Sequence, residues 1–206
     1  MSEPLFLVPL ALEARAVARG AGAHNVERIG MGPAKSTAAR VRLDRLAATA
    51  RPLVVLGVGG GLVKGMSPGD VVVATSIQIT NQEASIALVH SAEIAQLLRS
   101  AGLVVAEAPI ISSPKIISGV DERLRAAALG AVAVDMESYW CAPLAARHPF
   151  GVVRVLLDTP EYELFSPRIP MTVARAWKSL SRVARSLRAW SPGTLNDVTL
   201  TEVGEA

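Results

Sequence analysis

The segment LGAVAVDMESYWCA, residues 129–142, carries an apolar run that ends in two carboxylates, Asp135 and Glu137, with Met136 between them. The run AVAV at 131–134 is short and rich in valine, which is typical of a buried strand. Two acids therefore stand where a core strand meets the segment that follows it. Glu137 is a candidate for a ligand site, whereas Asp135, with its side chain on the opposite side of the strand from Met136, is expected to be an N-cap or a loop anchor.

Apolar runs of the same kind recur along the chain. We expect strands, rich in Val and Leu, at 5–10, 26–31, 52–58, 70–75, 103–111, 131–135 and 151–158. Helices are expected at 11–20, 34–48, 91–101, 120–128, 137–147 and 171–190. Continuous apolar strands are covered by helices on both faces. The alternation therefore predicts a three-layer α/β/α sandwich around a central, largely parallel twisted sheet.

Length and composition narrow the class of protein. The chain has 206 residues, of which 50% are hydrophobic, and this fits one compact domain. We place that domain at 1–190 and expect a flexible tail at 191–206, which lacks periodicity. A net charge of only +3 with 4% aromatic residues argues against nucleic acid as a partner. The single cysteine, Cys141, excludes an internal disulfide and fits a cytoplasmic protein.

Carboxylates follow three of the expected strands. Glu13 comes after the first strand, Asp135 and Glu137 follow 131–135, and Asp158 ends 151–158. Ligands of open α/β sheets bind beyond the carboxyl ends of the strands. We therefore expect these side chains to gather at one edge of the sheet.

A glycine-rich stretch, GVGGGL at 57–62, follows another strand. Gly59, Gly60 and Gly61 allow backbone N–H groups to approach an anion or a sugar, although a tight turn is the alternative role. The stretch is not a dinucleotide fingerprint, because VKGMSPGD continues as a turn rather than a helix. The three histidines show no metal-ligand spacing, and we predict no metal and no cofactor.

Taken together, these stretches resemble the nucleoside phosphorylase and nucleosidase superfamily that contains methylthioadenosine/S-adenosylhomocysteine nucleosidase. The matching features, in order, are Glu13, IGMGPAKSTAA, GVGGGL, PGDVVVAT, VDMES, and Arg154 with Asp158 in VRVLLD. The order SSPKIISGVDERLRAAALGAVAVDMES looks most like the hopanoid-associated adenosylhopane nucleoside phosphorylases. The resemblance implies cleavage of the N-glycosidic bond of a purine nucleoside with a bulky 5′ substituent, by phosphorolysis or hydrolysis.

The resemblance also implies a role for individual side chains. Asp158 would face purine N7 and donate a proton, Glu137 would accept hydrogen bonds from the ribose hydroxyls, and Met136 would pack on the sugar. Glu13 would activate water, and Arg154 would steer Glu13 or Glu137. The structural alternatives are a turn cap for Asp158 and a helix N-terminal charge for each glutamate.

The resemblance implies no cofactor other than inorganic phosphate as a co-substrate, and it implies a homo-oligomer. Val58 and Leu157 replace serines that are frequent in the superfamily, which leaves a catalytically decayed nucleoside-binding or assembly protein as the alternative function. Helix 171–190 combines apolar residues at helical spacing with a cationic flank. This pattern suits peripheral membrane contact, or packing on the sheet with the charges in water.

Overall fold

The computed structural model describes residues 2–46, 51–80, 84–162 and 169–192, and within them one sheet holds eight strands. The strands are β1 (Leu5–Val8), β2 (Val26–Arg28), β3 (Leu53–Gly61), β4 (Val71–Ile79), β5 (Ser85–Ala87), β6 (Val105–Ser112), β7 (Ala133–Asp135) and β8 (Phe150–Asp158). The α-helices are α1 (Ala11–Ala21), α2 (Pro33–Leu46), α3 (Ser91–Ser100), α4 (Val120–Ala127), α5 (Ser138–Cys141) and α6 (Ile169–Leu187). The tail expected to be flexible lies outside the described residues beyond position 192.

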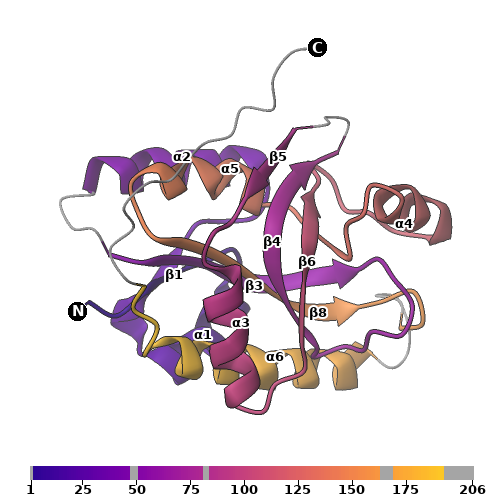
Figure 1. Ribbon diagram of the computed structural model, residues 1–206. Helices are drawn as coiled ribbons and strands as arrows, with labels where there is room; N and C mark the ends of the chain where they lie inside the picture. Colours follow the sequence, from indigo (N-terminus) through magenta and orange to yellow (C-terminus); the bar gives the residue numbers. More distant parts are fainter. Residues whose placement is uncertain (1, 47–50, 81–83, 163–168, 193–206) are drawn as a thin grey trace.

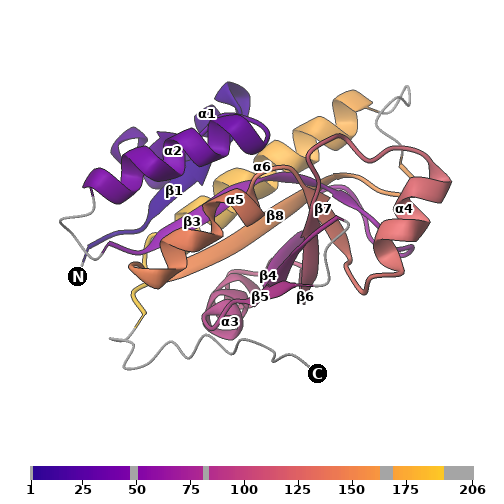
Figure 2. The same cartoon turned by 90° about the horizontal axis from the view of Figure 1, so that it is seen from above.

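Helices cover both faces of the sheet (Figure 1). α2 and α5 lie over one face, whereas α1, α3 and α6 lie over the other. Figure 2 gives the same arrangement from above, and in both views α4 stands at one end, away from α1 and α2. The expected three-layer α/β/α sandwich is therefore confirmed.

The sheet is mixed. Its order is β2-β1-β3-β7-β6-β4-β5, and β8 pairs with both β3 and β4. Five pairings are parallel, while β3–β7, β4–β5 and β4–β8 are antiparallel. The pairings β3–β8, β8–β4, β4–β6, β6–β7 and β7–β3 form a closed cycle. This half of the sheet closes on itself, because β8 enters between β3 and β4 and β7 returns to the end of β3.

The glycine-rich stretch belongs to β3 and is not a loop, which corrects the sequence-based expectation. The pairing of β3 with β8 shifts register between Gly59 and Gly60, and β7 pairs with Gly60 and Gly61. A Cβ atom on Gly59 would lie only 2.9 Å from the backbone oxygen of Val134. The glycines are needed here because two other strands approach the same strand end closely.

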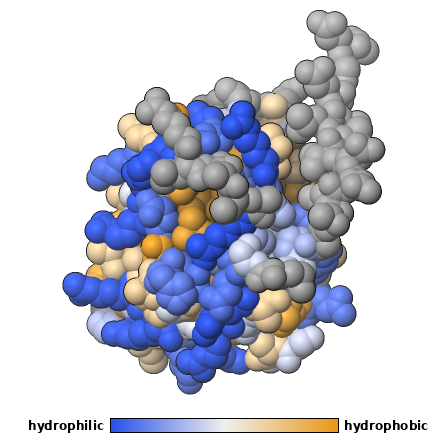
Figure 3. Space-filling view, turned by 90° about the vertical axis from the view of Figure 1, so that its left-hand side faces the viewer, coloured by the Kyte–Doolittle hydropathy of each residue, from blue (hydrophilic) through white to orange (hydrophobic). Residues whose placement is uncertain are grey.

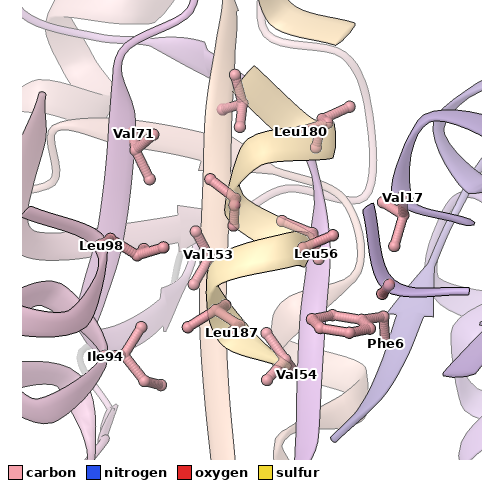
Figure 4. Packing of buried hydrophobic residues seen from close by; sticks show 14 of the residues in the cluster. Phe6, Val17, Val54, Leu56, Val71, Ile94, Leu98, Val153, Leu180 and Leu187 are labelled. Atoms are coloured by element: carbon pink, nitrogen blue, oxygen red, sulfur yellow. The ribbon is translucent and has the colours of Figure 1, made fainter. Parts of the chain in front are cut away.

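The central strands are apolar along their length because hydrophobic clusters lie on both faces of the sheet. Phe6, Val54 and Leu56 project into one cluster with Leu180 and Leu187 of α6 (Figure 4). The alternate residues of β3 enter a second cluster, on the side of α2 and α5. Both faces of the strand are thus buried, so no alternation of polar and apolar residues is expected.

Helix α6 uses its apolar face for packing. Leu180, Val183, Ala184 and Leu187 are fully buried, and Trp190 is nearly so. The apolar face of this helix is packed in the core and cannot also enter a bilayer. Within the described residues, no helix is both long and apolar enough to cross a membrane.

The expected elements differ from the observed ones in several places, such as β4, which runs to Ile79 instead of ending at 75. The helix expected at 137–147 is α5 followed by a 3₁₀ helix at Ala142–Ala146, because Pro143 lacks the N–H that an α-helix needs. The strand expected at 26–31 ends at Arg28. Strand β5 carries the short sequence SIA, which gives no strand signal of its own.

Candidate active site

The ends of four strands surround one cavity of about 310 Å³, a size typical of small-molecule sites. β1 leads to it through the first turn of α1, and β3, β7 and β8 end at it. It is lined by Pro9, Leu10, Glu13, Met31, Val58, Gly59, Gly60, Lys115, Ile116, Ile117, Ser118, Gly119, Arg123, Val134, Asp135, Met136, Glu137, Leu157 and Asp158. The cavity thus brings together most of the residues selected from the sequence, while Gly61 and Arg154 do not line it.

Glu13 lies at the start of α1 with 1% of its surface exposed. Its carboxylate accepts hydrogen bonds from the backbone N–H of Leu10 at 2.8 Å and of Val58 at 2.9 Å. Burial raises the pKa of Glu13, and these two N–H groups oppose the rise only in part. A buried carboxylate with a raised pKa is suited to proton transfer near neutral pH.

Glu137 directly precedes α5 and has 4% of its surface exposed. The backbone N–H of Gly32 donates to Oε1 at 3.2 Å, and Arg154 Nη2 donates to Oε2 at 3.2 Å. Burial, aided by the nearby charge of Asp135, raises the pKa of Glu137 to about 7 against the opposing effect of Arg154. Glu137 stands at the N-cap position of α5, where the helix-charge alternative places it, but its side chain makes no capping hydrogen bond there.

Arg154 is fully buried on β8 behind the cavity. Nε donates to Asp135 Oδ2 at 2.8 Å, and Nη2 contacts both Glu137 and the hydroxyl of Ser138. Asp135 is therefore its main partner, whereas the sequence suggested Glu13 or Glu137. A Cβ atom on Gly57 would lie 2.7 Å from Nη1, so glycine is needed where the guanidinium passes β3. Arg154 is placed to position carboxylates rather than to touch a ligand.

Asp158, at the end of β8, forms an ion pair with Arg123 of α4. Arg123 has 5% of its surface exposed and also donates to the backbone oxygen of Gly61. The sequence reasoning did not select Arg123. The available signal was its place in VDERLRAA, on the same helical face as buried Ala126, because a charge on a buried face needs a partner.

Met136 and two of the glycines complete the wall. Met136 is half-buried and lines the cavity between Asp135 and Glu137. A Cβ atom on Gly60 would lie 3.4 Å from Asp158 Oδ1 and 3.5 Å from Arg123 Nη1. Gly60 therefore keeps the backbone of β3 close to this ion pair.

Chemically, the cavity has a carboxylate-rich part with Glu13 and Glu137 and a separate ion pair of Asp158 with Arg123. In the part of the chain that the structure describes, no group of three or more His, Cys, Asp and Glu side chains is placed to hold a metal ion. The cavity is thus equipped for acid–base and hydrogen-bond chemistry.

A sequence model of the phosphorylase superfamily matches residues 20–176. The chain belongs to the phosphorylase superfamily. The superfamily expected from the sequence is thereby confirmed. No curated protein sequence matches the chain.

Solved structures share the fold of this superfamily member at low sequence identity. The 5′-methylthioadenosine/S-adenosylhomocysteine nucleosidase of Campylobacter jejuni has a TM-score of 0.75 at 14% identity, covering 90% of this chain and 98% of its own. The corresponding nucleosidase of Colwellia psychrerythraea, solved with adenine, has a TM-score of 0.74 at 15% identity, covering 91% and 95%. Futalosine hydrolase of Helicobacter pylori has a TM-score of 0.71 at 17% identity, covering 90% and 97%.

Proposed function

We propose that the protein is an enzyme that cleaves the N-glycosidic bond of a purine nucleoside. The observation that carries this proposal is that Glu13, Glu137 and Asp158, from three separate strand ends, line one cavity. The fold shared with nucleosidases supports it, since one of those structures holds adenine. Bond cleavage of this kind makes the sugar oxocarbenium-like and places negative charge on the departing base, which acids and hydrogen-bond donors can assist without a cofactor.

The carboxylate-rich part of the cavity is assigned to the sugar. Glu137 would accept hydrogen bonds from ribose hydroxyls, and Met136 beside it would pack on the ring. Asp158 is assigned to the other end, where the purine N7 would lie. Arg154 is assigned a positioning role, because it contacts Glu137 but not the cavity.

We favour water over phosphate as the acceptor. Leu10 and Val58 line the cavity, and their backbone N–H groups, which could otherwise bind a phosphate, are already bound to Glu13. Arg154 is bound by Asp135 and Glu137, and a carboxylate beside the sugar would repel an anion. Glu13 would instead accept a proton from the attacking water.

The substituent at the 5′ position is proposed to be large and apolar. Leu10, Met31 and Ile116 line the cavity and are 39%, 45% and 59% exposed, so they stand at its opening. Apolar side chains at an opening favour an apolar group on the ligand. An adenosylated hopanoid, to which the sequence resemblance points, has a substituent of this kind and would connect the enzyme to hopanoid biosynthesis.

We further propose a cytoplasmic homo-oligomer. Val120, Leu124 and Leu129, in and after α4, are 64%, 60% and 51% exposed, and clustered exposed apolar residues mark interaction surfaces. On the face shown in Figure 3, hydrophilic residues are interspersed with apolar areas. Sedimentation velocity tests this assignment: a monomer at micromolar concentration, or an unchanged oligomer in Leu124→Asp, would contradict it.

Incubation with a panel of purine nucleosides, with and without phosphate, tests the function. We expect free base in both conditions and at equal rates. Base released only with phosphate would identify a phosphorylase. Tight binding without base release would identify a nucleoside-binding protein. The panel includes nucleosides with 5′-alkyl groups of increasing length, for which we expect rising kcat/KM.

A further inference from the structure

Arg123 is a buried cation at the cavity for which the proposed function has no role. It projects from α4, which begins after Gly119, and lines the cavity together with Asp158. Its terminal nitrogens donate to Asp158 Oδ2 and to the backbone oxygen of Gly61. Among the described residues its Nε is buried without a hydrogen-bond partner. The guanidinium is thus held at the cavity wall by one carboxylate and one carbonyl.

In this contact Arg123 is the donor and Asp158 is the acceptor. A guanidinium stays protonated at any pH near neutrality, and it stabilises a bound carboxylate as the anion. The carboxylate of Asp158 is therefore engaged as a hydrogen-bond acceptor and not as a proton donor. Arg123 is a buried cation at this end of the cavity, and its N–H donors can meet developing negative charge.

We propose that Arg123 is a catalytic residue that stabilises the departing purine, and that Asp158 is the positioning residue that orients its guanidinium. This inference rests on the proposed function. Arg123 would donate a hydrogen bond to N7 as the base takes on negative charge. Donors held in place where charge develops are effective because they need no rearrangement during the reaction.

The bonds and protons of the reaction then balance without a proton donor beside the purine. The C1′–N9 bond breaks and its electron pair passes into the purine ring, where the guanidinium meets it. The oxygen of water bonds to C1′, and its proton passes to Glu13. The purine anion takes a proton from solvent after release, and Glu13 returns its proton to solvent, so nucleoside plus water gives base plus sugar.

Two substrates distinguish this role from a structural one. Adenosine has a purine leaving group that needs stabilisation, whereas the nitrophenolate of 4-nitrophenyl β-D-riboside is stable as an anion. We expect Arg123→Gln to lower kcat on adenosine by about 10²- to 10³-fold and on the nitrophenyl riboside by less than about threefold. Equal losses on both substrates, or unchanged turnover of adenosine, would overturn the inference.

Three further variants complete the experiment. Arg125→Gln, an exposed residue of the same helix, is the matched control and should leave both rates unchanged. Asp158→Asn keeps the cation and should lose less activity on adenosine than Arg123→Gln; a larger loss would restore Asp158 as the proton donor. If Arg123→Gln does not fold, the double variant Arg123→Gln/Asp158→Asn, which removes both buried charges, carries the same substrate comparison.

Failure of the inference is distinguishable from failure of the proposed function. A wild-type protein that cleaves neither these two substrates nor the 5′-alkyl nucleosides of the panel contradicts the function itself. A wild-type protein that cleaves both, with an Arg123→Gln variant of normal rate on adenosine, contradicts only the role of Arg123.

Discussion

Arg154 Nη2 lies 2.6 Å from Asp135 Oδ2, and neither side chain is exposed to solvent. The pair joins β8 to the end of β7, and the same Nη2 reaches Glu137 at 3.2 Å. Asp135 also accepts hydrogen bonds from the hydroxyls of Ser112 and Ser138, so three side chains hold its carboxylate in place. Asp135, at the end of β7, therefore helps to position Glu137 through Arg154.

Removal of the arginine should destabilise the fold. We expect Arg154→Met to lower the free energy of unfolding by about 3–5 kcal/mol, because it leaves the buried carboxylate of Asp135 without its partner. Urea denaturation measures the change. Arg175→Met, an exposed position on α6, is the control and should stay within about 0.5 kcal/mol of wild type. An Arg154→Met variant as stable as this control would show that the pair contributes nothing.

Stability should fall as pH rises. The pKa of Glu137 is about 7 in the folded protein against 4.5 for an unperturbed carboxyl, so folding favours the protonated form. Its stabilising contribution is complete below about pH 4.5 and is lost as pH rises to about 7, a change of about 3 kcal/mol. The raised pKa of Glu13 acts in the same direction.

Unfolding free energies of wild type and Glu137→Gln between pH 5 and 8 measure this effect. The variant has no carboxyl to titrate, so its stability should depend less steeply on pH. Asp121→Asn, an exposed acid on α4, should keep the wild-type slope. Identical slopes for wild type and Glu137→Gln would mean that Glu137 is ionised throughout.

Sugar recognition should depend on Glu137. We expect Glu137→Gln to lower kcat/KM for ribonucleosides by about 10²-fold and to change the values for deoxynucleosides far less, because the lost acceptor serves the hydroxyls. Measured kcat/KM values for adenosine and its 2′- and 3′-deoxy forms give the comparison. An unaltered preference for ribose would contradict the assignment.

Gly59 should tolerate no side chain. The Cβ atom of Gly59→Ala would lie 2.9 Å from the backbone oxygen of Val134, and backbone on β7 cannot move away cheaply. We expect a loss of about 1–3 kcal/mol in unfolding free energy, together with lower activity since Gly59 lines the cavity. Thermal denaturation and base release measure the two effects, and a fully stable, fully active variant would count against the close approach of β7.

The three layers could be predicted from the sequence because strands and helices each have a local pattern of apolar residues. Apolar runs covered on both faces gave most strands, and amphipathic segments gave the helices. The closed cycle of strands was not predictable, since it depends on pairings between distant residues such as Gly60 with Val134. The short strand β5 was missed for a related reason: its pairing with β4, and not its composition, makes it a strand.

Only the part of the candidate site that lies at strand ends could be predicted from the sequence. Glu13, Glu137 and Asp158 share a cavity because strand ends meet at one edge, and strand ends can be read from apolar runs. Arg123 could not be found this way, because it comes from a helix 35 residues before its partner Asp158. Arg154 was selected, but its main partner, Asp135, is set by packing between β7 and β8.

Base release from adenosine in phosphate-free buffer, compared between wild type and Glu13→Gln, tests the central claim most directly. We predict that wild type releases adenine at a rate that added phosphate does not change, and that Glu13→Gln releases it about 10²- to 10⁴-fold more slowly because the general base is lost. Wild-type release that requires phosphate, or a Glu13→Gln variant with the wild-type rate, would contradict cleavage by water activated at Glu13.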